Sequence, residues 1–390
     1  MPPTFPFQTP SYVDNDPEAD ALLAQHGPVV AAKMGPMDIW LALSYRAVRQ
    51  VLADSRFSRE AATRPGGPMK SPVASNPLLI LSMDGKRHAR VRKLMGQAFS
   101  VRMVEQLEPG IQAIVDSLLD ELSSPANLVD GLAAPLPTMV ICELLGAPSA
   151  DHKDIRRWTR AIFAQTQTPE ELQASQNDIG GYIAGLVHEK RANPDDKLIS
   201  AMVAANDEGD YLTEEELLTN LVGLLIGGQD TTVGALGNSF VTLLRHPDQF
   251  RKLHDNPSLI GPAVEELLRY SRLASATEPR VTTEPVLLEG VELGADAIAL
   301  PVLSSANRDP DAYPDPGRFD ITREGPAPHV GFAHGPHFCL GAPLARMEMR
   351  LAIAATIKRF PGLRLAVAPE ELAYDTGHIL RSLEALPVTW

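Results

Sequence analysis

The sequence predicts a mainly α-helical protein with a smaller β-rich region, and three observations carry this prediction. Apolar residues recur at helical spacing over residues 100–210, with short breaks such as Pro109-Gly110. A second helical pattern runs without proline from Thr213 to Arg245, about 30 residues or roughly 45 Å of helix. Residues 276–302, in contrast, are rich in strand-forming side chains and contain two turn signals.

Composition and charge limit the classes of function. The chain has 390 residues, 44% of them apolar, which is enough for a substantial core. Its 35 basic and 49 acidic residues give a net charge of −14, which argues against nucleic acid as a partner. No apolar run reaches the ~18 residues of a membrane helix, and no secretory leader is visible. We therefore expect a cytoplasmic protein with no membrane partner.

The first quarter of the chain alternates between helix and strand signals. Asp16 is placed to cap a short helix that starts at Pro17. Residues 29–43 predict a hairpin and residues 45–54 a helix. Residues 55–77 lose every periodic pattern, so we expect a long loop of the kind that often contacts ligands.

A basic helix is predicted next, over residues 83–94. His88 and Arg92 are four positions apart and therefore share one face, which suits the binding of carboxylates. Arg90 and Lys93 point elsewhere. A solvated helix face is the simplest interpretation of these two, and docking of an acidic partner is the alternative.

The long helix contains an unusual centre. It opens with a capping box at Thr213, but its middle reads Gly227-Gly228-Gln229-Asp230-Thr231-Thr232. Each glycine in a helix interior costs about 1 kcal/mol relative to alanine. Glycines let a flat ligand approach the backbone, and a threonine hydroxyl can open the helical ladder. A notch for helix packing beside a surface aspartate is the structural alternative.

The two cysteines have different surroundings. Cys142 lies in an apolar helical run and is interpreted as a core residue. Cys339 lies between glycines in the segment 332–341, just before a predicted helix start at Ala342-Pro343. A helix N-terminus favours thiolate over thiol, so Cys339 suits a haem iron. An unreactive cysteine is the structural alternative.

The pattern F-x-x-G-x-H-x-C-x-G, from Phe332 to Gly341, resembles the haem-ligand signature of the cytochrome P450 family and is complete here. The resemblance covers essentially the whole chain. It implies the cytochrome P450 fold as one domain over 1–390, with β-rich parts near 28–43, 276–302 and 363–390. It also implies haem b (iron protoporphyrin IX), with Cys339 as the metal ligand and Phe332 and Gly341 beside the cofactor.

Further roles follow from the same resemblance. The propionate-binding positions of the family match His88, Arg92, Arg280 and His337. Its acid–alcohol pair, which relays protons during oxygen activation, matches Asp230 and Thr231. Because members that use peroxide typically replace this pair, the match indicates dioxygen as the oxidant.

The resemblance also supplies a structural network and a pocket. Glu266, Arg269 and Arg318 match buried charges that brace the cysteine loop in the family, although an exposed helical ion pair is the ordinary meaning of the Glu266–Arg269 spacing. The positions expected to face substrate are Leu79, Leu224, Gly227, Gly228, Ala274, Ser275 and Leu380. We expect an apolar small molecule, but the motifs do not separate hydroxylation, epoxidation and oxidative coupling.

The implied enzyme is a monomeric monooxygenase, with secondary metabolism as the expected context. It takes electrons from a ferredoxin, which a ferredoxin reductase supplies from NAD(P)H. Two other classes remain open at this point. A haem gas sensor or carrier would use Cys339 but not Asp230 and Thr231. A metal hydrolase would use the short spacing of His334, His337 and Cys339 to bind zinc.

Overall fold

A computed structural model describes residues 2–8, 14–69, 75–99, 101–164, 168–209, 212–325, 327–375 and 380–390. The chain divides into two compact units, which are considered separately. Unit 1 comprises Met1–Pro77, Leu81–Lys86 and Gly261–Cys339. Unit 2 comprises Leu78–Ile80, Arg87–Ile260 and Leu340–Trp390. A single domain over 1–390 stays a prediction.

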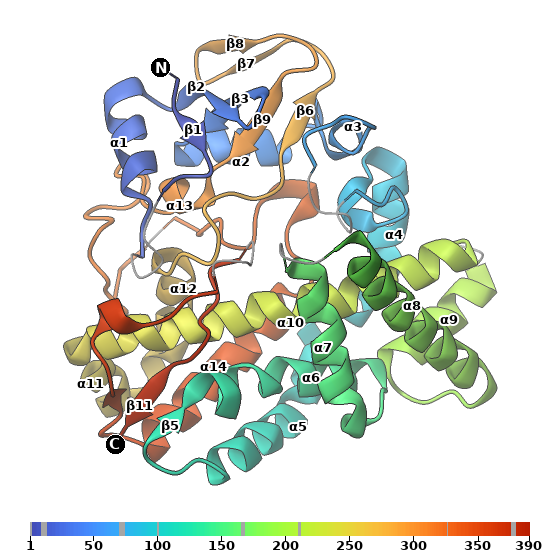
Figure 1. The fold of residues 1–390 in the computed structure, drawn as a ribbon, viewed down its shortest axis with the longest axis vertical. Coiled ribbons are helices and arrows are strands. Elements are labelled where there is room, and N and C mark those ends of the chain that lie inside the picture. Colours follow the sequence, from blue (N-terminus) through green and yellow to red (C-terminus); the bar gives the residue numbers. More distant parts are fainter. Residues whose placement is uncertain are drawn as a thin grey trace. The chain divides into compact units, whose positions relative to one another are not determined.

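Unit 1 is built on a six-stranded sheet in the order β1-β2-β3-β9-β6-β4 (Figure 1). Its strands are β1 (Thr4–Phe5), β2 (Val29–Met34), β3 (Met37–Ala42), β4 (Phe57–Ser58), β6 (Arg280–Thr282) and β9 (Ile298–Pro301). The predicted hairpin is β2 and β3, which pair antiparallel from Val29–Ala42 to Met34–Met37. A separate two-stranded sheet joins β7 (Val286–Leu288) to β8 (Val291–Leu293).

Side chains alternate across β3 and bury both faces of the sheet. Ile39 and Leu41 pack in a cluster that includes Ala19 of α1 (Pro17–His26). Trp40 and Ala42 pack in a second cluster, with apolar residues of α2 (Tyr45–Ala53). Unit 1 also holds α3 (Arg59–Ala62) and α13 (Leu303–Ala306).

Two predictions for this part of the chain need correction. Residues 55–77 are not all loop, because β4 pairs with β6 and is followed by α3. Helix α1 does begin at Pro17, but the Asp16 side chain does not cap it. Instead, the buried Asp16 carboxylate accepts hydrogen bonds from Arg272 and Ser304. A distant guanidinium therefore outcompetes the local backbone for this carboxylate.

Unit 2 is mostly helical and also contains one small sheet. Its helices are α5 (Val101–Asp120), α6 (Pro135–Leu145), α7 (His152–Phe163), α8 (Pro169–Ala192), α9 (Leu198–Gly209), α10 (Glu214–Arg245), α11 (Pro247–Asp255) and α14 (Ala342–Arg359). The strands β5 (Ala126–Asn127), β11 (Pro387–Thr389) and β10 (Arg364–Leu365) form its antiparallel sheet. Helices α4 (Gly85–Ala98) and α12 (Ile260–Tyr270) each begin in one unit and end in the other.

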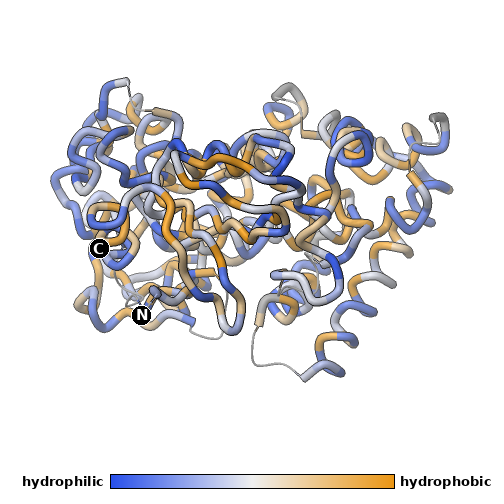
Figure 2. The backbone as a smooth tube through the Cα atoms, turned by 90° about the horizontal axis from the view of Figure 1, so that it is seen from above, coloured by the Kyte–Doolittle hydropathy of each residue, from blue (hydrophilic) through white to orange (hydrophobic). Residues whose placement is uncertain are grey.

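The predicted break at Pro109-Gly110 is wrong, because α5 runs through it. Both residues are exposed, so water can satisfy the carbonyl that proline leaves without a donor. Figure 2 shows hydrophobic and hydrophilic stretches alternating along the helices, as expected where one side of each helix is buried. Among the described helices, none combines the length and the apolar character that a membrane crossing needs.

Helix α10 is the long helix that the sequence predicts, and α6, α7 and α8 pack against it (Figure 1). Its 32 residues begin with the expected capping box between Thr213 and Glu216. Two buried asparagines of α10 hold other segments. Asn220 accepts from Ile80 N and donates to Leu78 O, at 2.9 Å each. Asn238 exchanges two hydrogen bonds with Arg381. The helix is therefore the scaffold of unit 2.

The cysteine loop of unit 1 folds back on itself from Phe332 to Cys339. Cys339 N donates to Phe332 O at 2.9 Å. Gly335 has φ of +71°, and a Cβ built there would lie 2.7 Å from Leu52 O of α2. Only glycine fits a left-handed residue at such a close approach.

We predict that Gly335→Ala destabilises the protein by about 2 kcal/mol or more, because the new methyl group meets backbone atoms in a strained conformation. The measurement is urea unfolding followed by circular dichroism. Gly294→Ala is the matched control, since its Cβ would meet nothing within 4 Å. Equal stability of the two variants would contradict the prediction.

Candidate functional site

The thiol of Cys339 lies on the surface of unit 1. The rings of Phe332 and Phe338 pack edge to face with centroids 6.3 Å apart, and His329 packs on Phe332 at 5.6 Å. These contacts fix the loop while leaving the sulfur accessible. Helix α14 begins three residues later, with Gly341 as its N-cap and a proline in its first turn.

Cys142 contrasts with Cys339 as the sequence predicts. It is buried in α6. Burial, with a smaller effect of Asp151, raises the pKa of its thiol to about 12. A thiol of that kind is inert at neutral pH, so Cys142 is a core residue.

Arg280 and His337 lie together in unit 1 and share an electrostatic environment. Arg280, at the start of β6, is only 3% exposed. Burial lowers the pKa of His337, and the positive charge of Arg280 lowers it further, whereas Asp84 opposes both effects. His337 Nε2 lies 3.6 Å from Asp84 Oδ1. Burial and the Arg280 charge thus disfavour protonation of the His337 ring, although the ring faces a carboxylate.

Asp84 is a site residue that the sequence analysis missed. Burial opposes ionisation of its carboxyl, but His337, the Ser58 hydroxyl at 2.6 Å and Glu60 N at 2.9 Å together lower its pKa to about 2. Its position just before the start of α4 was the available signal, since acids are frequent there. Asp84 links α3 and the cysteine loop.

Arg59 is the second missed residue. It is 2% exposed and stands in α3, within the segment that the sequence predicts as loop. Its Nε donates to Leu81 O at 2.7 Å and its Nη1 to Pro279 O at 3.3 Å. Its charge lowers the pKa of Arg280, after burial as the main cause. An arginine in an aperiodic stretch gives no signal of burial.

These cations decide whether the residues fit a haem. Haem carries two propionate groups, and a carboxylate is best held by guanidinium groups out of water. Among the described residues, neither Arg59 nor Arg280 forms a hydrogen bond or ion pair with a carboxylate. A buried cationic pair beside a loop with an accessible thiol fits the cofactor.

The other predicted cofactor and catalytic residues belong to unit 2. His88 is 4% exposed and Arg92 is half-buried, one turn further along α4. Asp230 is 9% exposed at the middle of α10. Thr231 Oγ1 donates to Gly227 O at 2.7 Å, so its lone pairs remain available to accept a hydrogen bond.

One face of α10 is left accessible. Leu224, Gly228 and Thr231 are half-buried and Gly227 is exposed, whereas most of the helix around them is buried. A Cβ at Gly227 would meet nothing within 4 Å, and one at Gly228 would lie 3.3 Å from Ile141 Cδ1. The predicted pocket positions of α10 thus share its open face.

The remaining pocket positions lie on three segments. Leu79 is buried, and it packs so closely on α10 that its Cδ1 would be 2.4 Å from a Cβ at Gly223. Ala274 and Ser275, in unit 1, are half-buried. Leu380 is half-buried in unit 2, and residues 376–379 before it lie outside the described residues.

The structure confirms the pairing of Glu266 with Arg269 but places Arg323, not Arg318, beside them. Arg269 holds Glu266 through two hydrogen bonds of 2.7 and 2.8 Å, and both side chains are buried. Arg318 contributes its carbonyl oxygen to Arg269, but its guanidinium is exposed and pairs with Asp320. Arg323 instead approaches Glu266 at 3.3 Å. Sequence spacing did not distinguish which arginine turns inward.

Arg90 also differs from its simplest interpretation. It donates to the buried Glu216 of α10 at 2.7 Å, so it ties α4 to α10 rather than forming only a solvated face. Lys93 is exposed.

Comparison with known proteins establishes the family. The model of the family described as "Cytochrome P450" matches residues 138–371. Nocardicin C N-oxygenase of Nocardia uniformis subsp. tsuyamanensis is 40% identical, over 99% of this chain and 98% of that protein. Cytochrome P450 monooxygenase PikC of Streptomyces venezuelae is 42% identical, over 90% of this chain and 85% of that protein.

The chain belongs to the cytochrome P450 family.

A solved relative agrees with this assignment. The LnmA cytochrome P450 hydroxylase of Streptomyces atroolivaceus S-140 has a TM-score of 0.92 and 37% identity, with both chains covered to 100%. The predicted fold class is therefore confirmed. The protein is an oxidoreductase, a cytochrome P450 monooxygenase, and the family's cofactor is haem iron.

The zinc alternative loses support. Within the part of the chain that the structure describes, no three His, Cys, Asp or Glu side chains gather so as to hold a metal ion. A protein-only zinc site requires such a group.

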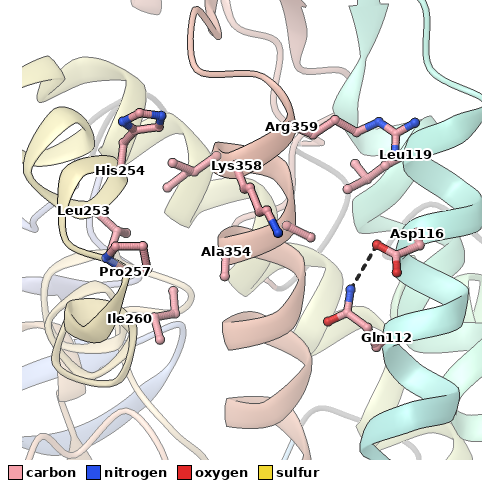
Figure 3. Close-up of a pocket in the computed structure, with 12 residues that line it drawn as sticks. Gln112, Asp116, Leu119, Leu253, His254, Pro257, Ile260, Ala354, Lys358 and Arg359 are labelled. Carbon is pink, nitrogen blue, oxygen red and sulfur yellow. Dashed lines mark hydrogen bonds between the residues drawn. The ribbon is translucent and has the colours of Figure 1, made fainter.

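Another feature of this cytochrome P450 is a groove of about 670 Å³ in unit 2. Figure 3 shows α14 at its centre, with Gln112 and Asp116 of α5 on one side and Leu253 and His254 of α11 on the other. Its lining includes none of the predicted site residues.

The Asp84 contacts predict a pH dependence. Because folding lowers the pKa of Asp84 from 3.8 to about 2, its contribution is complete above pH 4 and is lost as the pH falls toward 2. We expect Asp84→Asn to be less stable by on the order of 1 kcal/mol at pH 5, after allowance for solvent screening, with the gap narrowing at lower pH. Urea unfolding at stepped pH measures this difference in stability between variant and wild type. The difference should change less with pH for Ser58→Ala than for Asp84→Asn. A gap independent of pH would contradict the assignment.

Proposed function

We propose that this cytochrome P450 is a haem-thiolate monooxygenase that inserts one atom of dioxygen into an apolar small molecule, by hydroxylation or epoxidation. The observation that carries the proposal is the cysteine loop, which presents the thiol of Cys339 on a rigid backbone. When bound, the haem supplies the activation of dioxygen. The other oxygen atom leaves as water, which requires two electrons and two protons.

The electrons come from a ferredoxin, which a ferredoxin reductase supplies from NAD(P)H. Relatives of this chain include nocardicin C N-oxygenase and mycinamicin IV hydroxylase/epoxidase, and these support a substrate from secondary metabolism. Leu79, Leu224, Ala274, Ser275 and Leu380, with the backbone of Gly227 and Gly228, would contact that substrate. Their apolar character supports an apolar ligand.

Both an anionic thiolate and cationic or hydrogen-bond-donating side chains would hold the cofactor. Cys339 would ligate the iron as thiolate, with Phe332 and Gly341 beside it. Arg280, His337, His88 and Arg92 would hold the two propionates. The burial of Arg280 supports this role, because a buried cation needs a partner of opposite charge.

Protons would enter through α10. The Asp230 carboxylate, at the edge of burial, would take a proton from water and pass it toward Thr231. The Thr231 hydroxyl donates its own hydrogen to Gly227 O and would hold a water molecule on its free lone pairs. The pair would thus hold and deliver a proton on the accessible face of the helix.

The ligand prediction is tested by carbon monoxide. We expect the reduced wild-type protein under carbon monoxide to show the red-shifted Soret band of thiolate ligation, and Cys339→Ser to lose it because a serine oxygen donates less electron density. Cys142→Ser is the control and should keep the band. A normal band in Cys339→Ser would refute the proposal. A thiolate band without NAD(P)H-driven turnover would favour a gas sensor or carrier.

The proton-delivery prediction has a control within the same helix. Thr231 and Thr232 each donate to the carbonyl four residues earlier, but Thr232 is buried and Thr231 is partly accessible. With a reconstituted ferredoxin system, we expect Thr231→Ala to form less product and more hydrogen peroxide per NAD(P)H. Thr232→Ala should stay coupled. Asp230→Asn should slow turnover by roughly 100-fold. Equal coupling in the two threonine variants would contradict the assignment.

A further inference from the structure

Arg59 is a buried guanidinium whose charge the described residues do not neutralise by direct contact. Its donors meet Leu81 O at 2.7 Å, Pro279 O at 3.3 Å and Met69 Sδ at 3.4 Å. These acceptors are two carbonyl oxygens and a sulfur. They satisfy N–H groups but carry no full negative charge.

Arg280, the residue after Pro279, also makes no direct contact with a carboxylate among the described residues. It is 3% exposed, and its described hydrogen bond goes from Nη1 to Glu278 O at 3.3 Å. Burial lowers the pKa of both arginines, and Arg59 is the next cause for Arg280. Two like charges thus lie close together out of water, an arrangement that costs several kcal/mol unless an anion joins them.

The nearby carboxylates do not serve as that anion. Asp84 is engaged by Ser58, Glu60 N and His337. Glu278 is half-buried, and its side chain makes no described contact with either guanidinium. Both acids act on the arginines only at longer range. By contrast, the buried Arg269 has its own carboxylate, Glu266, at 2.7 Å.

We propose that Arg59 and Arg280 together hold one carboxylate group, and that a propionate of the haem supplies it. The inference rests on the proposed function. It adds to that function a residue from α3, a helix to which no cofactor role is otherwise assigned. Two guanidinium forks provide enough donors for both carboxylate oxygens and offset the charge that the fold leaves uncompensated. A substrate carboxylate has the same chemistry and is the other possible source.

Haem release from the ferric holoenzyme tests the proposal. Transfer of haem to excess apomyoglobin gives the rate. We expect Arg59→Gln to release haem about 10-fold faster than wild type, the effect of one lost charged hydrogen bond. Arg64→Gln is the control, since Arg64 lies in the same segment but its side chain is 60% exposed. It should release haem at the wild-type rate.

Haem dimethyl ester separates a direct contact from a structural effect. The ester lacks both carboxylates, so wild type should release it faster than haem. If Arg59 holds a propionate, the ratio of the two rates falls in Arg59→Gln. If Arg59 only supports the loop, both rates rise together and the ratio is unchanged. Arg59→Lys, which keeps the charge but loses the fork, replaces Arg59→Gln should the latter not fold.

The outcomes distinguish a haem propionate from a substrate carboxylate as the group that the two arginines hold. Normal haem release together with weakened laurate binding, measured by calorimetry, would assign the site to a substrate carboxylate. Normal values for haem release, the ester ratio and laurate would overturn the proposal. If wild type itself shows no thiolate-ligated haem under carbon monoxide, the proposed function fails first. If wild type shows the thiolate band but Arg59→Gln changes none of the measured values, the proposed function stands and only the role of Arg59 is refuted.

Discussion

The cost of burying arginine charge governs much of this structure. A guanidinium that leaves water must recover its lost hydration from partners inside the protein. Arg269 does so through the Glu266 carboxylate, and Arg272 through Asp16. Arg59 and Arg280 meet only carbonyl oxygens and sulfur among the described residues. The first two arginines stabilise the fold, whereas the last two mark where a ligand has to complete it.

The same need for hydrogen-bond partners explains why the buried polar residues of α10 are tolerated. Glu216 closes the capping box and also accepts from Arg90. Asn220 holds the segment Leu78–Ile80, Asn238 holds Arg381, and Gln229 accepts from Thr159 at 2.6 Å. Each of these side chains replaces lost water with a partner from a different element. A helix that serves as a scaffold therefore also sets the position of its accessible centre, from Leu224 to Thr231.

Membership of the cytochrome P450 family sets the reaction class but leaves the substrate open. Relatives near 40% identity carry names as different as nocardicin C N-oxygenase and vitamin D(3) 25-hydroxylase. One fold thus serves ligands of unlike shape, because the residues that contact substrate lie on loops and exposed helix faces. The positions proposed for substrate contact here include Leu79, which is buried, and Ser275 and Leu380, which are half-buried.

The sequence by itself determined the features that depend on neighbours along the chain. These include the capping box and length of α10, the β2–β3 hairpin, the contrast between Cys142 and Cys339, and the family motif. Each depends on periodicity, turn chemistry or fixed spacing. Only the tertiary structure decided where long side chains point. In the structure Arg323, not Arg318, approaches Glu266, and Asp16 pairs with Arg272 instead of capping its helix. Arg59, Asp84 and Arg280, which are far apart in sequence, share one electrostatic environment. The physical reason is that partners of buried charges are chosen by distance in space, which no local pattern records.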